Sequence, residues 1–187
     1  MCDCQTSTLA ARAVTSVASP LRRFFRQNRA TSSVEFALLA TPFLALALGI
    51  IQTAIVFFAG QSLETAASTA GRLIMTGQAQ TQGWTADQFK QQVCDQVQGM
   101  LNCSGLNIDV QNYSSFGSVN LALPINNGNL NTANMGYNPG IPGNVVVVRL
   151  YYQYPVYFNV IGLNNLSGGL SLLTATAVFQ NEPYASS

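Results

Sequence analysis

The chain has 187 residues, enough for one folded domain and a membrane anchor. Only 8% of its residues are charged, against ~25% in ordinary soluble proteins, and 48% are hydrophobic. This composition is typical of an extracytoplasmic or membrane-associated protein and argues against a cytosolic enzyme.

The N-terminal segment predicts a flexible leader that ends in basic residues. Residues 1–21 are rich in Ser, Thr and Ala, and Pro20 interrupts any helix there. Four arginines then precede a long apolar run: Arg22, Arg23, Arg26 and Arg29. Basic residues beside an apolar segment stay in the cytoplasm, so we expect a cytoplasmic N-terminus and an external C-terminal part. Nucleic-acid binding by these arginines is the weaker interpretation, because the adjoining apolar run already accounts for them.

Residues 36–60 predict a transmembrane helix. They form a run of 25 residues without a charge, which as a helix spans ~38 Å, more than the ~30 Å hydrocarbon core of a bilayer. Glu35 lies at the cytoplasmic edge of this run, and Pro42 removes a backbone donor, which predicts a kink. A cleaved signal peptide is the alternative, since residues 45–47 read Ala-Leu-Ala, although its apolar region would be shorter.

The helix is expected to continue beyond the membrane to about Thr76 and to end at Gly77. Apolar residues recur there at helical spacing on one face. They are Leu63, Ala67, Ala70 and Ile74. Small residues at 66, 67, 70 and 71 allow close packing, either against the chain's own domain or against a partner helix.

A second helix is predicted to begin near Thr85, because Thr85 and Gln88 have the spacing of a capping box. Its expected buried face is Phe89, Val93, Val97 and Met100.

The cysteines fall on both sides of the predicted membrane. Cys94 and Cys103 are external, where a disulfide is allowed. A continuous helix would hold them ~13.5 Å apart, beyond the ~7 Å limit for bridged Cα atoms. A bridge therefore requires the helix to stop near Gly99, and two buried free thiols are the alternative. Cys2 and Cys4 are cytoplasmic and do not have the pattern of a metal site.

From Leu106 the hydrophobic period changes to two, which indicates strands. The predicted strands cover residues 106–111, 119–123, 145–154 and 170–179, and the last one places Leu173, Ala175, Ala177 and Phe179 on one side. We expect an α+β domain with three or four antiparallel strands packed against helices. Residues 124–143 carry mostly turn chemistry and are expected to be an exposed interaction loop or mobile surface.

The sequence argues against catalysis. It has no histidine, so the commonest general base, the usual triads and most zinc sites are missing. It also lacks the nucleophile-elbow, phosphate-loop and dinucleotide-binding motifs. A carboxylate pair such as Asp109 with Glu182 could form only in the fold, and both acids are expected to be surface charges. We predict no enzyme, no catalytic or metal-binding residues and no cofactor.

Several separated pieces resemble the TadE-like pseudopilins of bacterial tight-adherence (Tad/Flp, type IVc) pili. The pieces are the Val-Glu-Phe-Ala-Leu run at 34–38 with Pro42, the small residues at 66–72 with Gly77, Cys94 with Cys103, and the close at residues 177–184. Together they span nearly everything from residue 22 onward.

The resemblance implies a minor pilin-like component with a cytoplasmic leader (1–30), an N-terminal helix (31–77) and a periplasmic α+β domain (78–187). A prepilin peptidase would cut between Ala30 and Thr31, although the family usually has Gly where this chain has Ala30. Glu35, followed by Phe36, would then pair with the new amine of Thr31 in a neighbouring subunit and set the register; in an uncleaved anchor, Glu35 would instead be an unpaired interfacial acid.

The resemblance also implies location and partners. The expected location is the inner membrane, single-pass, with incorporation into the pilus as a further possibility. The expected partners are other pilins or pseudopilins, inner-membrane assembly proteins and membrane lipid, with no nucleic acid. The alternative is a signal-anchored periplasmic binding module without a pilus role, which would use the 124–143 loop.

Overall fold

The computed structural model describes residues 28–97, 99–157, 162 and 164–184. The chain divides into two compact units, residues 1–47 and 48–187, and each is described by itself. The predicted leader, with Arg22, Arg23 and Arg26, lies outside the described residues apart from its last three positions.

Helix α2 (Asn28–Met75) contains the predicted membrane segment and the predicted external extension. Pro42 lies inside it. Hydroxyls in its apolar part are satisfied within the helix, since Thr41 Oγ1 donates to Ala37 O at 2.7 Å and Thr53 Oγ1 donates to Gly49 O at 2.8 Å. The helix ends as predicted, because Gly77 adopts a φ of +77° and its N–H bonds to Ile74 O at 2.9 Å.

Two further helices follow, α3 (Gln78–Thr81) and α4 (Ala86–Val97). The predicted capping box is confirmed, because Thr85 N donates to Gln88 Oε1 and Gln88 N donates to Thr85 Oγ1. The buried face of α4 is Phe89, Val93, Cys94 and Val97. Including Met100 in that face was wrong, since α4 ends at Val97 and Met100 is exposed.

Three long strands form one antiparallel sheet in the order β1-β4-β5. They are β1 (Leu106–Tyr113), β4 (Val145–Pro155) and β5 (Leu170–Gln180). A small hairpin, β2 (Ile125–Asn126) with β3 (Asn129–Leu130), forms a second sheet, and short 3-10 turns cover Cys103–Gly105 and Phe116–Ser118. The predicted α+β class, with a helix packed on a three-stranded antiparallel sheet after a long apolar helix, is confirmed.

The strand expected at residues 119–123 is wrong. This segment is irregular, and Leu121 and Leu123 are more than half exposed. Residues 136–138 occupy the edge of β1 that this segment could have joined, because Val110 N donates to Gly136 O and Asn138 N donates to Val110 O. Without a neighbouring strand or an apolar surface to cover, an alternating pattern does not form a strand.

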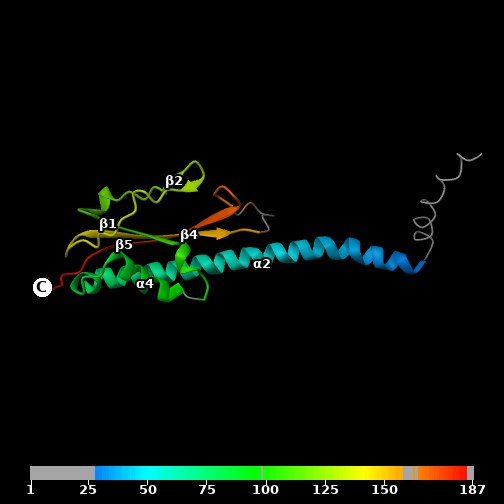
Figure 1. Cartoon of the computed structure of the whole chain (residues 1–187), viewed down its shortest axis with the longest axis horizontal. Helices are drawn as coiled ribbons and strands as arrows, with labels where there is room; N and C mark the ends of the chain where they lie inside the picture. Colours follow the sequence, from blue (N-terminus) through cyan, green and yellow to red (C-terminus); the bar gives the residue numbers. More distant parts are fainter. Residues whose placement is uncertain (1–27, 98, 158–161, 163, 185–187) are drawn as a thin grey trace, which may run out of the picture. The chain divides into compact units, whose positions relative to one another are not determined.

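The second unit has three layers, with the sheet in the middle (Figure 1). One face of the sheet packs on α4 and the C-terminal part of α2, including the predicted stripe Leu63, Ala67, Ala70 and Ile74, all of which are buried. Loops cover the other face around a smaller cluster of Tyr151, Leu166 and Leu172. Consecutive buried valines at 145–148 fit a strand that is covered on both faces.

Candidate functional site

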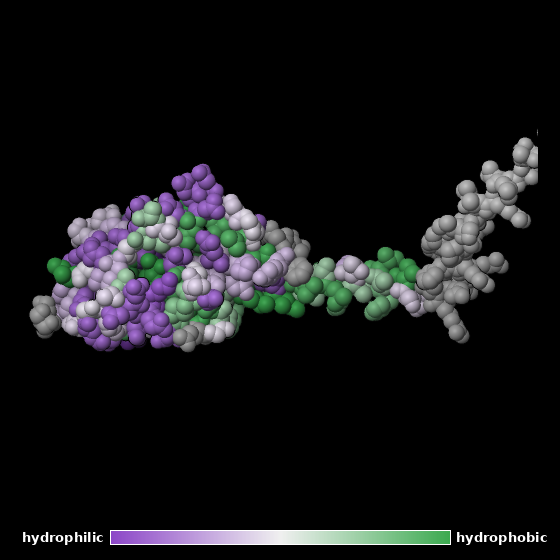
Figure 2. Space-filling model, viewed as in Figure 1, coloured by the Kyte–Doolittle hydropathy of each residue, from purple (hydrophilic) through white to green (hydrophobic). Residues whose placement is uncertain are grey.

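The early part of α2 has an apolar surface that is largely exposed among the described residues, although Gln52 and Val56 on one side of the helix are buried. Within the described residues, Ser32–Met75 is the one helix long and apolar enough to cross a membrane. Most of the large side chains between residues 34 and 58 are exposed, and the early part of the helix is mostly hydrophobic in Figure 2. We call the following residues the apolar surface of α2: Val34, Phe36, Leu38, Leu39, Phe43, Leu44, Leu46, Leu48, Ile50, Ile51, Ile55, Phe57 and Phe58. Contiguous apolar area of this kind indicates contact with lipid or with other apolar helices.

Glu35 is the acid at the start of this surface. It is exposed and lies in α2, directly before Phe36, whose exposed fraction is 73%. The backbone of Arg29, Ala30 and Thr31 belongs to the first turns of α2, while their side chains lie outside what the structure describes. The cleavage position and the register role of Glu35 therefore stay predictions.

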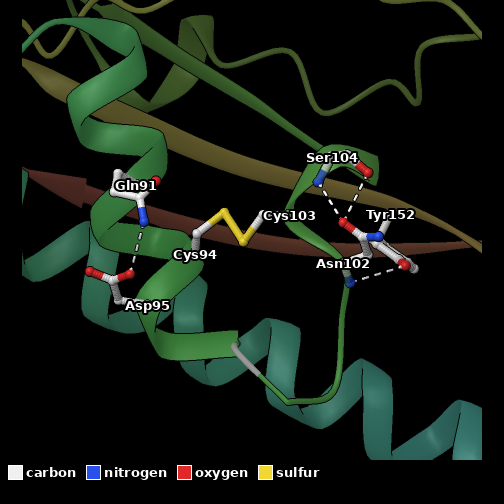
Figure 3. The surroundings of a disulfide bond; sticks show 7 residues. All are labelled: Gln91, Cys94, Asp95, Asn102, Cys103, Ser104 and Tyr152. Carbon is white, nitrogen blue, oxygen red and sulfur yellow. Dashed lines mark hydrogen bonds between the residues drawn. A yellow bond between two sulfur atoms is a disulfide. The ribbon is translucent and has the colours of Figure 1, made fainter.

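The predicted disulfide is present. Cys94 of α4 and Cys103 are bonded, with Cα atoms 5.6 Å apart (Figure 3). The chain reverses between them as expected, since α4 ends at Val97 and Gly99 adopts a φ of +93°. Asn102 organises the return, because its Oδ1 accepts hydrogen bonds from both the N–H and the hydroxyl of Ser104. Closing this short loop stabilises the fold by ~2–3 kcal/mol.

A buried ion pair, which the sequence did not predict, joins β1 to β4. Arg149 contacts Asp109 Oδ2 through Nη2 at 2.6 Å and Nε at 3.1 Å. The other carboxylate oxygen accepts from Gly136 N at 3.0 Å, and Arg149 Nη1 donates to Asn120 O at 3.1 Å. The pair therefore holds Gly136 and Asn120 onto the sheet. Both residues lie in the loops between β1 and β4 that cover this face, which we call the loop layer. In the sequence, the one charged residue in the apolar run 145–154, Arg149, indicated that a buried acidic partner was needed.

This geometry corrects the expectation for the acids. Asp109 is buried and paired with a cation, so calling it a surface charge was wrong, whereas Glu182 is exposed. Asp109 pairs with Arg149, and Arg149 lies opposite Thr176 of β5. Glu182 lies six residues after Thr176, beyond the end of β5. The two acids do not form a pair. No group of three or more potential metal ligands occurs within the described ranges.

Residues 124–143 are packed on the domain and do not form a free loop, because Leu130 and Met135 pack against the cluster around Tyr151 and Tyr137 packs against the helix-side core. Tyr137 bridges to Val110 and packs on Phe89 with ring centroids 5.2 Å apart. Its hydroxyl is buried without a hydrogen-bond partner among the residues described. Burial raises the pKa of Tyr137 to about 12.

The small residues of α2 pack against the chain's own sheet. Ala66, Ala67, Ala70 and Gly71 are buried. A Cβ on Gly71 would lie 3.0 Å from the Phe179 ring, and one on Gly77 would overlap the Tyr184 ring. Glu182 N also donates to Met75 O at 3.0 Å. The closing segment at 177–184 is therefore held along the end of α2. The small residues at 66–72 with Gly77 and the closing segment, which are separate in the sequence, thus contact each other in the fold.

Comparison with known protein families gave a match that lies within the N-terminal helix. The family described as TadE-like protein matches residues 30–72, which start in the first turn of α2 and end just past Gly71. No curated protein and no solved structure matches the chain. Residues 30–72 match a TadE-like family domain, and the other pieces on which the resemblance rests, the two cysteines and residues 177–184, lie outside this match.

Proposed function

We propose that this protein is a membrane-anchored, pilin-like structural component that acts in the biogenesis of a tight-adherence pilus. The observation that carries the proposal is the apolar surface of α2, which lies in a TadE-like domain and remains exposed in the folded chain. The same helix supplies the buried stripe of the folded C-terminal domain. One helix thus provides both a hydrophobic anchor and the core of a head.

In this proposal the chain crosses the bacterial inner membrane once, with a cytoplasmic N-terminus and a periplasmic head. The arginines before α2 favour that orientation. The apolar surface of α2 contacts lipid before assembly and the helices of other pilins or pseudopilins during it. Inner-membrane assembly proteins are further partners, and the protein performs no catalysis.

Glu35 is the residue that we propose to set subunit register. An ionised carboxylate near the bilayer interior costs ~2.5–3.5 kcal/mol unless a partner neutralises it. Cleavage between Ala30 and Thr31 by a prepilin peptidase would create such a partner, the amine of Thr31 in a neighbouring subunit. The intact mass of the membrane-extracted protein reports this cleavage directly.

Replacing Glu35 by Ala tests the function. We expect piliation to be lost while the amount of membrane-bound protein stays unchanged, because the helix still inserts. Glu182→Ala is the matched control, since it removes an exposed acid from the head, and it should leave piliation intact. Normal pili in the Glu35→Ala strain would overturn the assembly role.

That negative outcome would favour the second candidate, an anchored periplasmic binding module. The observation in its favour is a group of exposed apolar side chains on the loop layer. They are Phe116, Leu121, Leu123 and Ile125.

A further inference from the structure

The free edge of the sheet lies beside α2. In the order β1-β4-β5, the long strand β5 has β4 as its one strand neighbour among the described residues. Its direction follows that of α2, because Phe179 lies against Gly71 and Glu182 bonds to Met75 further along.

Hydrogen bonds at the start of β5 show which backbone groups point outward. Leu170 O accepts from Leu166 N, and Leu172 N donates to Asn165 Oδ1, so the even-numbered residues face away from β4. The next three even-numbered residues are Thr174, Thr176 and Val178, and all are exposed. Their N–H and C=O groups form an open edge, which is a template for an added strand.

A groove of about 570 Å³ separates this edge from α2. Its helix side carries Glu64 and Arg72, with Ser68 and Gly71 between them, and its strand side runs from Thr174 to Phe179. Glu64 and Arg72 are eight residues apart, or ~12 Å along the helix. That distance matches four residues of an extended strand, ~13 Å, and residues four apart lie on the same face of a strand.

We propose that this groove binds an extended segment of another protein, added antiparallel to β5, with an acidic residue opposite Arg72 and a basic residue four positions later opposite Glu64. The antiparallel direction is the more stable ladder. The charge order follows from the direction of α2, which puts Glu64 at one end of the groove and Arg72 at the other.

A second copy of this chain does not fit the groove in the same way. Both of its edge strands, β1 and β5, run in the direction of α2, since each pairs antiparallel with β4. Antiparallel pairing of two β5 edges would therefore set the two α2 helices in opposite directions. That exclusion rests on the proposed function, because it requires both helices to be anchored in one membrane with the same orientation.

The test measures binding of defined peptides to the full chain in detergent. The first peptide is nine residues long and fluorescent, with glutamate third and lysine seventh, and it is N-methylated along its outer edge to prevent self-association. The second peptide exchanges the two charges. The first peptide can form two exposed ion pairs that the second cannot, so we predict that it binds about two- to thirtyfold more tightly than the second.

Variants of the groove complete the test. The double substitution Glu64→Arg with Arg72→Glu should reverse the order of the two peptides. Thr176→Pro removes one outward N–H and should weaken both peptides about fivefold or more, whereas Thr176→Val should not. An intact disulfide and an unchanged thermal midpoint show that each variant is folded.

Three results would overturn the proposal. They are no binding of either peptide, equal binding of both, or an order that the double substitution leaves unchanged. A dimer of the chain alone that Thr176→Pro dissociates would assign the edge to a second copy and would also overturn it. None of these readouts depends on pili, so a negative result in the Glu35→Ala experiment remains a separate outcome.

Discussion

The two parts of α2 show how one helix can be stabilised in two different ways. In the early part, large apolar side chains such as Phe43 and Leu44 are exposed on the helix surface. In the later part, Leu63, Ala70 and Ile74 are buried in the core of the folded domain, and polar residues such as Glu64 and Arg72 are exposed. The stability of the early part therefore depends on the lipid or helices around it, whereas the stability of the later part depends on specific contacts within the chain.

Breaking the buried ion pair should have the largest effect on the head and none on the anchor. Replacing Asp109 by Ala leaves the largely buried Arg149 guanidinium without its carboxylate, which we expect to cost ~3–5 kcal/mol of unfolding free energy. Chemical denaturation in detergent measures this loss. Asp109→Leu combined with Arg149→Met should recover much of it, because an apolar pair replaces the ionic one. A double variant no more stable than Asp109→Ala would contradict this explanation.

Matched leucine substitutions compare the two parts of α2 directly. Leu63 is fully buried, so Leu63→Ala should lower the unfolding free energy of the head by ~2–5 kcal/mol. Leu44 is 56% exposed, so Leu44→Ala should leave that free energy unchanged. In contrast, Leu44→Arg should reduce membrane insertion, at a cost of ~2.5–3.5 kcal/mol. Equal effects of the two alanine substitutions on the head would remove the distinction.

Removing the disulfide should have a smaller effect that is confined to the head. The double substitution of Cys94 and Cys103 by Ser should lower the unfolding free energy by ~2–3 kcal/mol, because the unfolded chain regains conformational freedom. Thermal unfolding with and without reductant checks this in the wild type. The same substitutions should not change membrane extraction, and altered extraction would show that the two parts of α2 are not independent.

The smallest effect is expected at Tyr137, and it depends on pH. Tyr137→Phe removes a buried hydroxyl without a partner in the described part of the chain, so stability at pH 7 should be unchanged or slightly higher. Burial raises the pKa of Tyr137 to about 12 in the folded state, against about 10 in an unfolded chain. The wild type should therefore lose stability as the pH rises from about 10 to 12, since the unfolded state releases its proton first.

Burial also raises the pKa of Tyr151 and Tyr184, so the variant should keep part of the alkaline loss. A pH profile identical to that of the wild type would show that Tyr137 does not contribute.

Local signals explain what could be predicted from the sequence. The capping box at Thr85 and Gln88 and the turn at Gly77 are each decided by a few adjacent residues. The strands that begin at Leu106, Val145 and Leu170 were detectable because each segment has an alternating hydrophobic pattern or a run of β-branched residues. The hairpin turn at Asn127 and Gly128, with φ of 50° and 73°, carried a recognised Asn-Gly signal that was missed.

The remaining features depend on contacts between distant residues. Asp109 and Arg149 are separated by 40 positions, and only the register of β1 on β4 brings them together. The segment at 119–123 alternates like a strand, but another part of the chain occupies the edge of β1. For Glu35 the deciding partner belongs to another molecule, so the register prediction depends on the assembled pilus and not on the single chain.

Site-directed spin labelling at position 44 tests the central claim most directly. With Cys2 and Cys4 replaced by Ser, one label at residue 44 and, in a second variant, one at exposed residue 178 are compared in reconstituted bilayers. We predict that the label at 44 is accessible to oxygen and shielded from a water-soluble nickel chelate, whereas the label at 178 shows the reverse. Equal access of the nickel chelate to both labels would show that the apolar surface of α2 does not lie in lipid.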